Sequence, residues 1–434
     1  MRPTIDPLPP FGPLAGVRVI DLTVAFAGAF STMLLADLGA EVIKVESLQH
    51  YSTPSRGPRR PVPGNEAVSM SPVRDYPGAE PGEEPWNRIS WFNAHGRNKR
   101  AVTMDLTRER GRELFLRLFE QSDGLVENNP PGLLEKLRLG PEALLGRNPK
   151  GIVVRLPPLG LSGPDARTTG FGWHFEDLAG LLRLQGYPEG PEVGSIFMDA
   201  ASGPAGANAF LMALLARRRS GTGAVVEVAQ VENLVTHIGD LTMEAAMNGR
   251  VPARWGNRSP DFAPQGVYPC AGEDAWVALS VRADDEWARL VELLGPEAPG
   301  LRRPELATAA GRRAAHDEVD EAIARWTAAR PAREVAERLQ AAGIPAGPVL
   351  DEAGALADPH LAARGFFVVL DHPAAGTHPH PGPNFQLSGT PLRVWRAAPT
   401  VGQDNEYVYR RLLGVGEAEY RALERDGHIG NRYA

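Results

Sequence analysis

One carboxylate stands out in the sequence for the chemistry that its neighbours permit. Asp199 follows a short apolar run at 195–198, expected to be a strand, and precedes a segment of very small residues at 200–206. An aspartate at a helix start meets unpaired N–H groups and the positive end of the helix dipole. Small neighbours leave room for a substrate, so Asp199 is a candidate nucleophile toward an activated carbonyl. The local pattern by itself favours a plain N-cap.

A cluster of basic residues is the second candidate. Arg97, Asn98, Lys99 and Arg100 precede an expected strand, and Lys136 follows a turn further along the chain. Grouped guanidinium and ammonium groups can hold a phosphate or pyrophosphate. A solvated basic patch explains the same cluster equally well.

Histidines give weaker signals. His174 and Glu176 lie about 25 residues before Asp199, where they could contact a substrate, or His174 could be a satisfied interior histidine. His372, His378 and His380 lie among prolines. A metal site is conceivable there, but no distant ligand cluster supports it, so we expect a surface loop and no bound metal.

Composition excludes several classes of protein. The chain has 434 residues and a formal net charge of -7, which argues against nucleic-acid binding. Cys270 is the one cysteine, so no internal disulfide forms, and we expect a structural thiol at a strand end. The first residues lack the apolar core of a signal peptide, and no long apolar run could span a membrane. We therefore expect a cytoplasmic protein.

Strands alternate with helices through the first half of the chain. This alternation predicts an α/β protein with a doubly wound parallel sheet. The turn after the first strand lacks the Gly-x-Gly-x-x-Gly fingerprint, which weakens a nicotinamide hypothesis. A Pro- and Gly-rich stretch at 51–88 is expected to be a long surface loop or flap. The expected strands are 17–22, 41–45, 101–106, 124–127, 152–156, 195–198 and 224–229, and the expected helices are 27–38, 108–121, 203–218 and 231–248.

A break rich in Pro, Arg and Asn at 250–265 precedes a second region. A strand is expected there at 276–281, with helices at 284–294, 315–328 and 331–342. A linker helix at 351–365, short strands within 366–398 and a helical segment at 404–427 complete the chain.

Several segments together resemble one family. The opening segment Pro13 to Thr23 and the segment Ala27 to Glu46 match its first strand, helix and second strand. The match continues at Asn98-Lys99-Arg100, Val126-Glu127-Asn128, Ser220-Gly221-Thr222-Gly223, Gly256-Asn257-Arg258 and Gly343-Ile344-Pro345-Ala346-Gly347. Each motif alone is weak, but the ordered set resembles the class III coenzyme A transferases, also called the CaiB/BaiF family.

The resemblance implies an architecture. It implies a large Rossmann-like, CoA-binding domain formed by both chain ends, residues 1–235 and 380–434. A smaller α+β domain with linkers, residues 236–379, is inserted between them. It also implies an interlinked homodimer, an acyl-CoA and a carboxylic acid as substrates, and no tightly bound cofactor.

The resemblance also assigns roles to residues. Asp199 falls on the family's nucleophilic aspartate, which implies aspartyl anhydride and aspartyl-CoA thioester intermediates. Phe26, Phe171 and His174 are expected to face the acyl group. Expected coenzyme A contacts are Ala25, Ala27, Asn98, Lys99, Arg100, Asn128, Asn129 and Lys136.

Departures from the family pattern frame the alternatives. Ser47 stands where an Arg often contacts the nucleotide, and the usual Ser-Gly-Phe-Gly run is replaced at 156–160. The glycine run that covers the aspartate in some members is not visible. An α-methylacyl-CoA racemase shares the fold, but Phe171 replaces its histidine base. A CoA-dependent lyase or isomerase and a non-catalytic acyl-CoA-binding subunit are further alternatives. The aromatic character of 171–175 suggests a bulky or aromatic acid.

Overall fold

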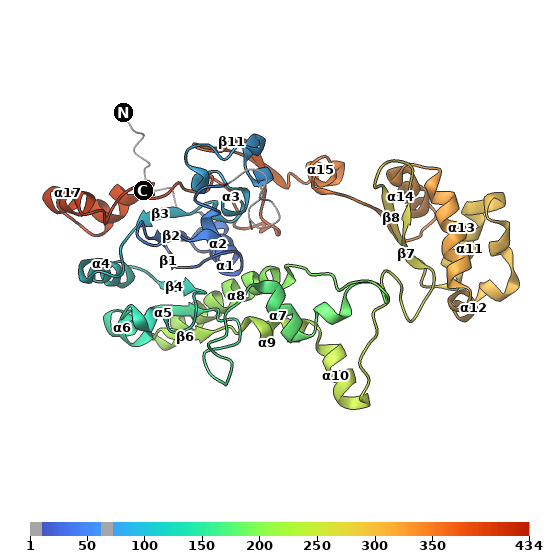
Figure 1. Cartoon of the computed structure of the whole chain (residues 1–434), viewed down its shortest axis with the longest axis horizontal. Coiled ribbons are helices and arrows are strands. Elements are labelled where there is room, and N and C mark those ends of the chain that lie inside the picture. The colour runs from blue at the N-terminus through green and yellow to red at the C-terminus, as the bar shows by residue number, and fades with distance from the viewer. Residues whose placement is uncertain (1–10, 62–72, 434) are drawn as a thin grey trace. The chain divides into compact units, whose positions relative to one another are not determined.

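The chain forms two compact units, each assembled from more than one segment. The computed structural model describes residues 11–61 and 73–433. Unit 1 comprises Met1–Leu181, Ser195–Ala246 and Gly365–Ala434, and unit 2 comprises Leu182–Gly194 and Met247–Arg364 (Figure 1). Unit 1 therefore joins both ends of the chain. The long insertion begins at Met247 and ends at Arg364, inside the 236–379 range expected from the sequence.

A six-stranded parallel sheet forms the centre of unit 1 and confirms the expected α/β class. Its strand order is β3-β2-β1-β4-β5-β6. Adjacent strands pair in parallel throughout. The order reverses between β1 and β4, which leaves a crevice beyond their carboxyl ends where such sheets bind ligands. The strands are β1 Arg18–Asp21, β2 Glu41–Glu46, β3 Arg100–Thr103, β4 Gly124–Glu127, β5 Ile152–Arg155 and β6 Ala224–Glu227.

Helix α1, Ala27–Asp37, packs closely against α8, Phe197–Ser220. A Cβ atom at Gly203 would lie 2.5 Å from Phe30 Cδ1, and one at Gly206 would lie 2.5 Å from Ser31 Oγ. Both glycines thus allow close helix packing, rather than the substrate access expected from the sequence. The other α-helices between residues 53 and 248 are α2 Thr53–Arg56, α3 Ser90–Gly96, α4 Glu109–Glu120, α5 Leu133–Lys136, α6 Pro141–Arg147, α7 Gly172–Ala179, α9 Gln230–His237 and α10 Gly239–Asn248.

The C-terminal segment returns to the β3 edge of the sheet. Asp404 Oδ2 accepts the Ala101 N–H at 2.9 Å, and Asn405 Oδ1 accepts the Thr103 N–H at 2.9 Å. A π-helix, Tyr407–Leu412, and α17, Glu417–Arg425, follow. These side-chain bonds satisfy an edge that would otherwise expose its backbone.

Two segments expected to be surface loops are in part buried: the segment of His372 and His380, and the 51–88 stretch. His372 and His380 are buried on a hairpin of β10, Phe367–His372, and β11, Gly376–Pro381, rather than on a surface loop. In the described part of 51–88, Arg56 is buried and paired with Glu46 on β2 at 2.5 Å, which ties this part of the stretch to the sheet. Residues 62–72 of that stretch lie outside the described residues.

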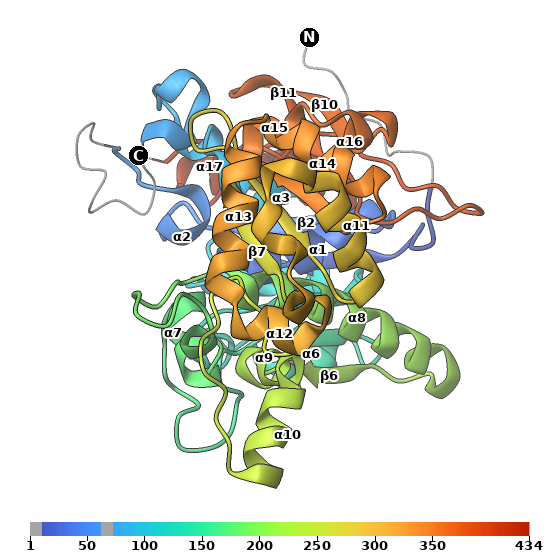
Figure 2. The ribbon, with the colours of Figure 1, turned by 90° about the vertical axis from the view of Figure 1, so that its right-hand side faces the viewer.

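Unit 2 has a core of its own. Three antiparallel strands, in the order β7-β8-β9, are covered by helices that gather around them (Figure 2). Cys270 is buried directly after β7, as the sequence predicted. The elements are β7 Gln265–Pro269, β8 Trp276–Ser280, β9 Ala346–Val349, α11 Asp284–Leu294, α12 Ala309–Ala314, α13 His316–Ala328, α14 Ala332–Ala341, α15 Glu352–Leu356 and α16 Pro359–Ala363.

Two expected helices are broken. The helix expected at 231–248 divides at Ile238 into α9 and α10, and the linker helix at 351–365 is the short pair α15 and α16. Pro359 at the start of α16 explains the second break, because proline cannot continue the preceding helix. Among the residues that the structure describes, no helix has both the length and the apolar character that a membrane crossing requires.

Candidate active site

Asp199 lies in the first turn of α8, and the segment directly before this helix is not a strand. Glu176, fully buried on α7, accepts the Met198 N–H at 2.8 Å and the Ser195 hydroxyl at 2.8 Å. These bonds cap α8 and take the place of the expected strand at 195–198. The sequence had left Glu176 as a possible substrate contact. Its bonds show that it fixes the start of the helix that carries Asp199.

The Asp199 carboxylate meets two further helix starts. Its Oδ1 accepts the N–H of Ala27, the first residue of α1, at 3.2 Å. A Cβ atom at Gly172, the first residue of α7, would lie 2.6 Å from Asp199 Oδ2, so a glycine is required for this approach. The carboxylate therefore lies beside the first residues of α1 and α7 as well as in the first turn of its own helix.

Burial nevertheless sets the ionisation of Asp199. Burial raises the pKa of Asp199 above its usual value, and the negative charge of Glu176 adds to the rise. The Ala27 N–H opposes this effect by stabilising the charged form. Asp199 is thus a partly buried carboxylate whose charged form is less favoured than it would be in water.

Asp199 opens into a cavity of ≈ 240 Å³ within unit 1. Several predicted site residues line it together with Asp199, namely Ala25, Phe26, Asn128, Asn129 and Phe171. The cavity is mostly aromatic and apolar, and none of its described lining residues is Lys, Arg or His. Gly172, Trp173 and Phe175, from the aromatic stretch at 171–175, also line the cavity. The further lining residues were not expected from the sequence, namely Val24, Pro54, Trp91, Pro130, Pro131, Pro158, Thr169, Gly170, Ile196, Met198 and Gln230.

The predicted cation cluster is turned inward. Arg97 pairs with Asp37 at 2.6 Å, Lys99 with Asp21 at 2.9 Å, and Arg100 with Asp404 at 3.0 Å. All three are buried, so their side chains form neither a solvated patch nor an open phosphate site in this chain. The sequence could not show this, because the partner carboxylates lie far away along the chain.

Asn98 and Lys136 complete the predicted polar set. Asn98 is buried with φ 62, and its amide donates to Asp37 Oδ1 at 2.7 Å and accepts the Trp395 N–H at 2.8 Å. It therefore holds the C-terminal segment, and neither Asn98 nor its basic neighbours line the cavity around Asp199. Lys136, at the end of α5, is exposed and lies outside the lining as well. Their contacts with coenzyme A stay predictions.

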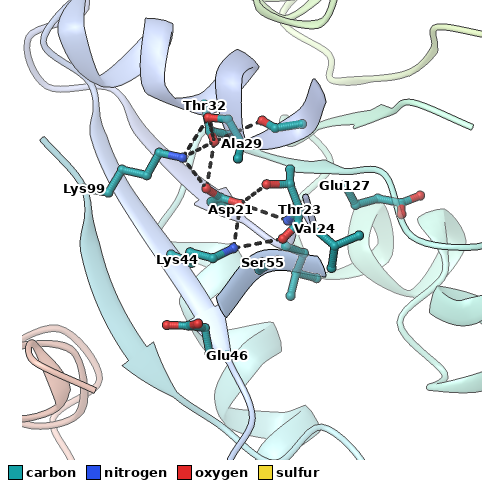
Figure 3. Close-up of polar contacts among 12 residues, drawn as sticks. Asp21, Thr23, Val24, Ala29, Thr32, Lys44, Glu46, Ser55, Lys99 and Glu127 are labelled. Carbon is teal, nitrogen blue, oxygen red and sulfur yellow. Dashed lines mark hydrogen bonds and ion pairs between the residues drawn. The ribbon is translucent and has the colours of Figure 1, made fainter. Parts of the chain in front are cut away.

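Lys99 belongs to a buried charge network under the loop between β1 and α1. Lys99 Nζ donates to Asp21 Oδ2, and Lys44 Nζ lies 3.5 Å from Asp21 Oδ1 (Figure 3). Against the opposing effect of burial, the two ammonium groups hold the pKa of Asp21 well below its usual value. Burial lowers the pKa of Lys99 to about 8, while its Asp21 partner opposes the fall. Thr23 and Thr32 complete the network by donating their hydroxyls to Asp21.

His174 is not the interior histidine considered from the sequence, and its contact with the acyl group stays a prediction. Its side chain is exposed, and Nδ1 accepts the Phe171 N–H at 3.1 Å, which caps α7. His174 does not line the described cavity, whereas Phe171 does. Among the described residues, no group of three or more His, Cys, Asp or Glu side chains is placed to hold a metal ion.

Comparison with known proteins identifies the class to which this fold and site belong. The model of CoA-transferase family III matches residues 14–405. The chain belongs to this family, as its sequence motifs had indicated, and is a class III CoA-transferase.

Individual relatives cover nearly the whole chain. It is 32% identical over 416 residues to a succinyl-CoA–D-citramalate CoA-transferase of Chloroflexus aurantiacus, covering 95% of this chain and 97% of the relative. It is 31% identical to the beta subunit of a succinyl-CoA–L-malate CoA-transferase of the same organism, covering 95% and 96%. Among solved structures, a CaiB/BaiF family protein from Brucella suis matches with a TM-score of 0.79 and 26% identity, covering 93% of this chain and all of that one.

Proposed function

We propose that this enzyme moves coenzyme A from an acyl-CoA donor to a free carboxylic acid, with Asp199 as the covalent nucleophile. The observation that carries the proposal is the position of Asp199. It lies in a cavity, at three helix starts, and is hydrogen-bonded to the Ala27 N–H. A plain helix cap would accept N–H groups of its own helix, whereas the Asp199 carboxylate accepts the N–H of Ala27 on α1.

The reaction divides into two exchanges, each through an anhydride. A carboxylate oxygen of Asp199 attacks the thioester carbonyl of the donor, and expulsion of the CoA thiolate from the tetrahedral adduct gives a mixed anhydride. The thiolate then attacks the aspartyl carbonyl, which gives an aspartyl-CoA thioester and releases the donor acid. The acceptor carboxylate attacks that thioester, forms a second anhydride and expels the thiolate. Attack of the thiolate on the acceptor carbonyl gives the new acyl-CoA and restores Asp199.

Backbone N–H groups supply the stabilisation that these steps need. Each tetrahedral intermediate at the aspartyl carbon carries a negative oxygen where Asp199 Oδ1 now accepts the Ala27 N–H. A fixed N–H donor directed at the developing charge stabilises such an oxyanion. Coenzyme A is a substrate in this scheme and not a resident cofactor. The loop after β1, which carries Ala25, and Asn129 after β4 are the surfaces proposed to receive its thiol end.

The lining supports an apolar or aromatic acyl group. Phe26, Trp91, Phe171, Trp173 and Phe175 all line the cavity, and no described cation there would neutralise a second carboxylate. The names of the two Chloroflexus relatives give succinyl-CoA, citramalate and malate, which are all dicarboxylic acyl groups or acids. Because the cavity of this chain is apolar and has no described lining cation, we propose instead a bulky, apolar monocarboxylic acid.

The racemase alternative has less support. It requires two bases on opposite sides of the α-carbon. Phe171 occupies the place of one, and His174 is bonded to the Phe171 N–H outside the cavity lining.

We also propose that the chain acts as an interlinked homodimer in the cytoplasm. Met212, Leu215 and Met243 on α8 and α10 are 59%, 48% and 56% exposed, a pattern typical of surfaces that a second chain covers.

The direct experiment measures CoA exchange between an acyl-CoA and a panel of free acids by mass spectrometry. Asp199→Asn should abolish exchange, whereas Asp177→Asn, a surface carboxylate on α7, should leave it intact. Hydroxylamine added with the donor should modify Asp199 of the wild type. Exchange at full rate in Asp199→Asn, or solvent deuterium entering the α-position with no free acid present, would contradict the proposal.

A further inference from the structure

Two asparagines bridge the strands at which the sheet order reverses. Asn128 and Asn129 follow directly after β4, and the loop of residues 22–26 follows directly after the neighbouring strand β1. This loop leads into α1 and therefore into the Ala27 N–H that contacts Asp199.

The two asparagines hold the loop through its backbone. Asn128 Oδ1 accepts the Val24 N–H at 2.7 Å, and Asn128 Nδ2 donates to the Val24 carbonyl at 2.9 Å. Asn129 Nδ2 donates to the Leu22 carbonyl at 2.7 Å. A planar amide that bonds both backbone groups of one residue fixes its position and orientation. Gly28 makes room for this amide, since a Cβ atom there would lie 2.9 Å from Asn128 Cγ.

The loop needs such support because its backbone is strained. Ala25 has φ 52, in the left-handed region that residues with a side chain rarely adopt. Strained residues persist only where their surroundings impose the conformation. Ser55 Oγ accepts the Ala25 N–H at 3.2 Å, and Lys44 Nζ donates to the Thr23 carbonyl at 2.8 Å (Figure 3).

We propose that Asn128 is a positioning residue, which holds Val24 so that the Ala27 N–H stays directed at Asp199. Only Ala25 and Phe26 separate Val24 from Ala27, so any movement of Val24 reaches the donor directly. The role rests on the proposed function of Asp199. This positioning role differs from the coenzyme A contact that the family resemblance implies for Asn128. Both the oxygen and the nitrogen of the Asn128 side-chain amide bond to the backbone of Val24.

The test compares two buried asparagine clamps in the full-length protein. Asn128→Ala removes the bonds to Val24, and Asn128→Asp keeps an acceptor for the Val24 N–H but loses the donor. Asn405→Ala is the matched control, since Asn405 also bonds backbone groups across the fold, on the β3 side of the sheet. The measurements are thermal stability, the Kd of coenzyme A by calorimetry, kcat and KM. The titration of the Asp199 carboxyl is followed by ¹³C NMR, with Asp199→Asn as the assignment control.

We expect Asn128→Ala to lower kcat about 10- to 100-fold, the scale of loss for a displaced reacting group. The Kd of coenzyme A should stay within about twofold of the wild type, because no coenzyme A contact is lost. Asp199 should titrate at higher pH, because it loses an N–H that lowers its pKa. Asn128→Asp should change kcat and the titration in the same directions. Asn405→Ala should lose stability but retain kcat and the titration of Asp199.

Three outcomes overturn the positioning role. They are an unchanged kcat and titration in both Asn128 variants, a weaker coenzyme A affinity with kcat retained, or equal losses in Asn405→Ala. Failure of the proposed function looks different. In that case Asp199→Asn retains full transfer, while the ¹³C titration of Asp199 in Asn128→Ala still decides whether Asn128 positions the Ala27 N–H.

Discussion

The carboxylate of Asp199 and the backbone N–H of Ala27 are joined by a 3.2 Å hydrogen bond, although 172 residues separate them in the chain. The bond connects the first turn of α8 with that of α1, beside the cavity. It supports the charged form of a carboxylate whose pKa burial raises. Ionised Asp199 is therefore held at the expense of stability.

Asp199→Asn should stabilise the protein at neutral pH. The folded state binds a proton at Asp199 more tightly than the unfolded state, because burial raises the folded pKa. Stability is thus lost as pH rises from the unfolded pKa through the folded pKa, and the loss is constant above both. The variant, which carries no charge, should have the higher Tm near pH 7, and the difference should shrink toward pH 3. A lower Tm for Asp199→Asn at pH 7 would oppose this view.

Gly172→Ala should lower activity with little effect on the fold. The added methyl would lie 2.6 Å from Asp199 Oδ2, so the carboxylate must move away from the Ala27 N–H. We expect kcat to fall roughly 10- to 100-fold. Gly146→Ala on α6 is the matched control, because its methyl meets nothing within 4 Å. Equal kcat values for both variants would show that Asp199 tolerates the shift.

Lys99→Met separates a structural role from a phosphate contact. The change leaves Asp21 buried with one ammonium partner in place of two, which should lower the free energy of unfolding by about 3–5 kcal/mol. The coenzyme A affinity of the folded variant should stay unchanged. Lys136→Met should behave in the opposite way if Lys136 contacts a CoA phosphate, with weaker binding and unchanged stability. Chemical denaturation and calorimetry measure both, and weaker binding by a fully stable Lys99→Met would contradict the structural role.

The acyl cavity should prefer aromatic and apolar acids. Its aromatic lining and the lack of a described lining cation predict a kcat/KM for arylacetic or branched-chain acids above that for succinate or malate. The preference should be at least about tenfold, since an unpaired carboxylate in an apolar site costs several kcal/mol. Trp91→Ala should reduce it by removing apolar contact area. A higher kcat/KM for dicarboxylic acids would show that a cation reaches the acyl group.

Sequence patterns predicted the sheet better than the small strands around it. β1, β2, β4 and β5 are mostly buried and each contains two or more adjacent apolar residues, which made them recognisable. β9 was not predicted, because it contains Gly347 and Pro348, two residue types that are uncommon inside strands. The apolar run before Asp199 looked like a strand, but it has no neighbouring strand and is instead bonded to Glu176.

Some residues of the candidate site were predicted and others were not, because a sequence does not show which distant residues the fold brings together. Asp199, Ala25 and Asn128 were placed by family resemblance, and the structure brings them to one cavity. The buried ion pairs of Lys99 and Arg100 were not predicted, because a sequence shows a cation but not the distant carboxylate that neutralises it. Trp91 was missed for a similar reason, since only the fold brings its helix to the β1–α1 loop.

Transfer of ¹⁸O from the acceptor acid to Asp199 tests the central claim most directly. In the proposed sequence, the acceptor carboxylate attacks the aspartyl-CoA thioester, and one of its oxygens stays on Asp199 when the second anhydride is opened by the thiolate. After a single turnover with a doubly ¹⁸O-labelled acceptor, mass spectrometry should find one ¹⁸O on Asp199 in its peptide, and none in Asp199→Asn. Complete turnover without label at Asp199, or label on a different carboxylate, would contradict the account.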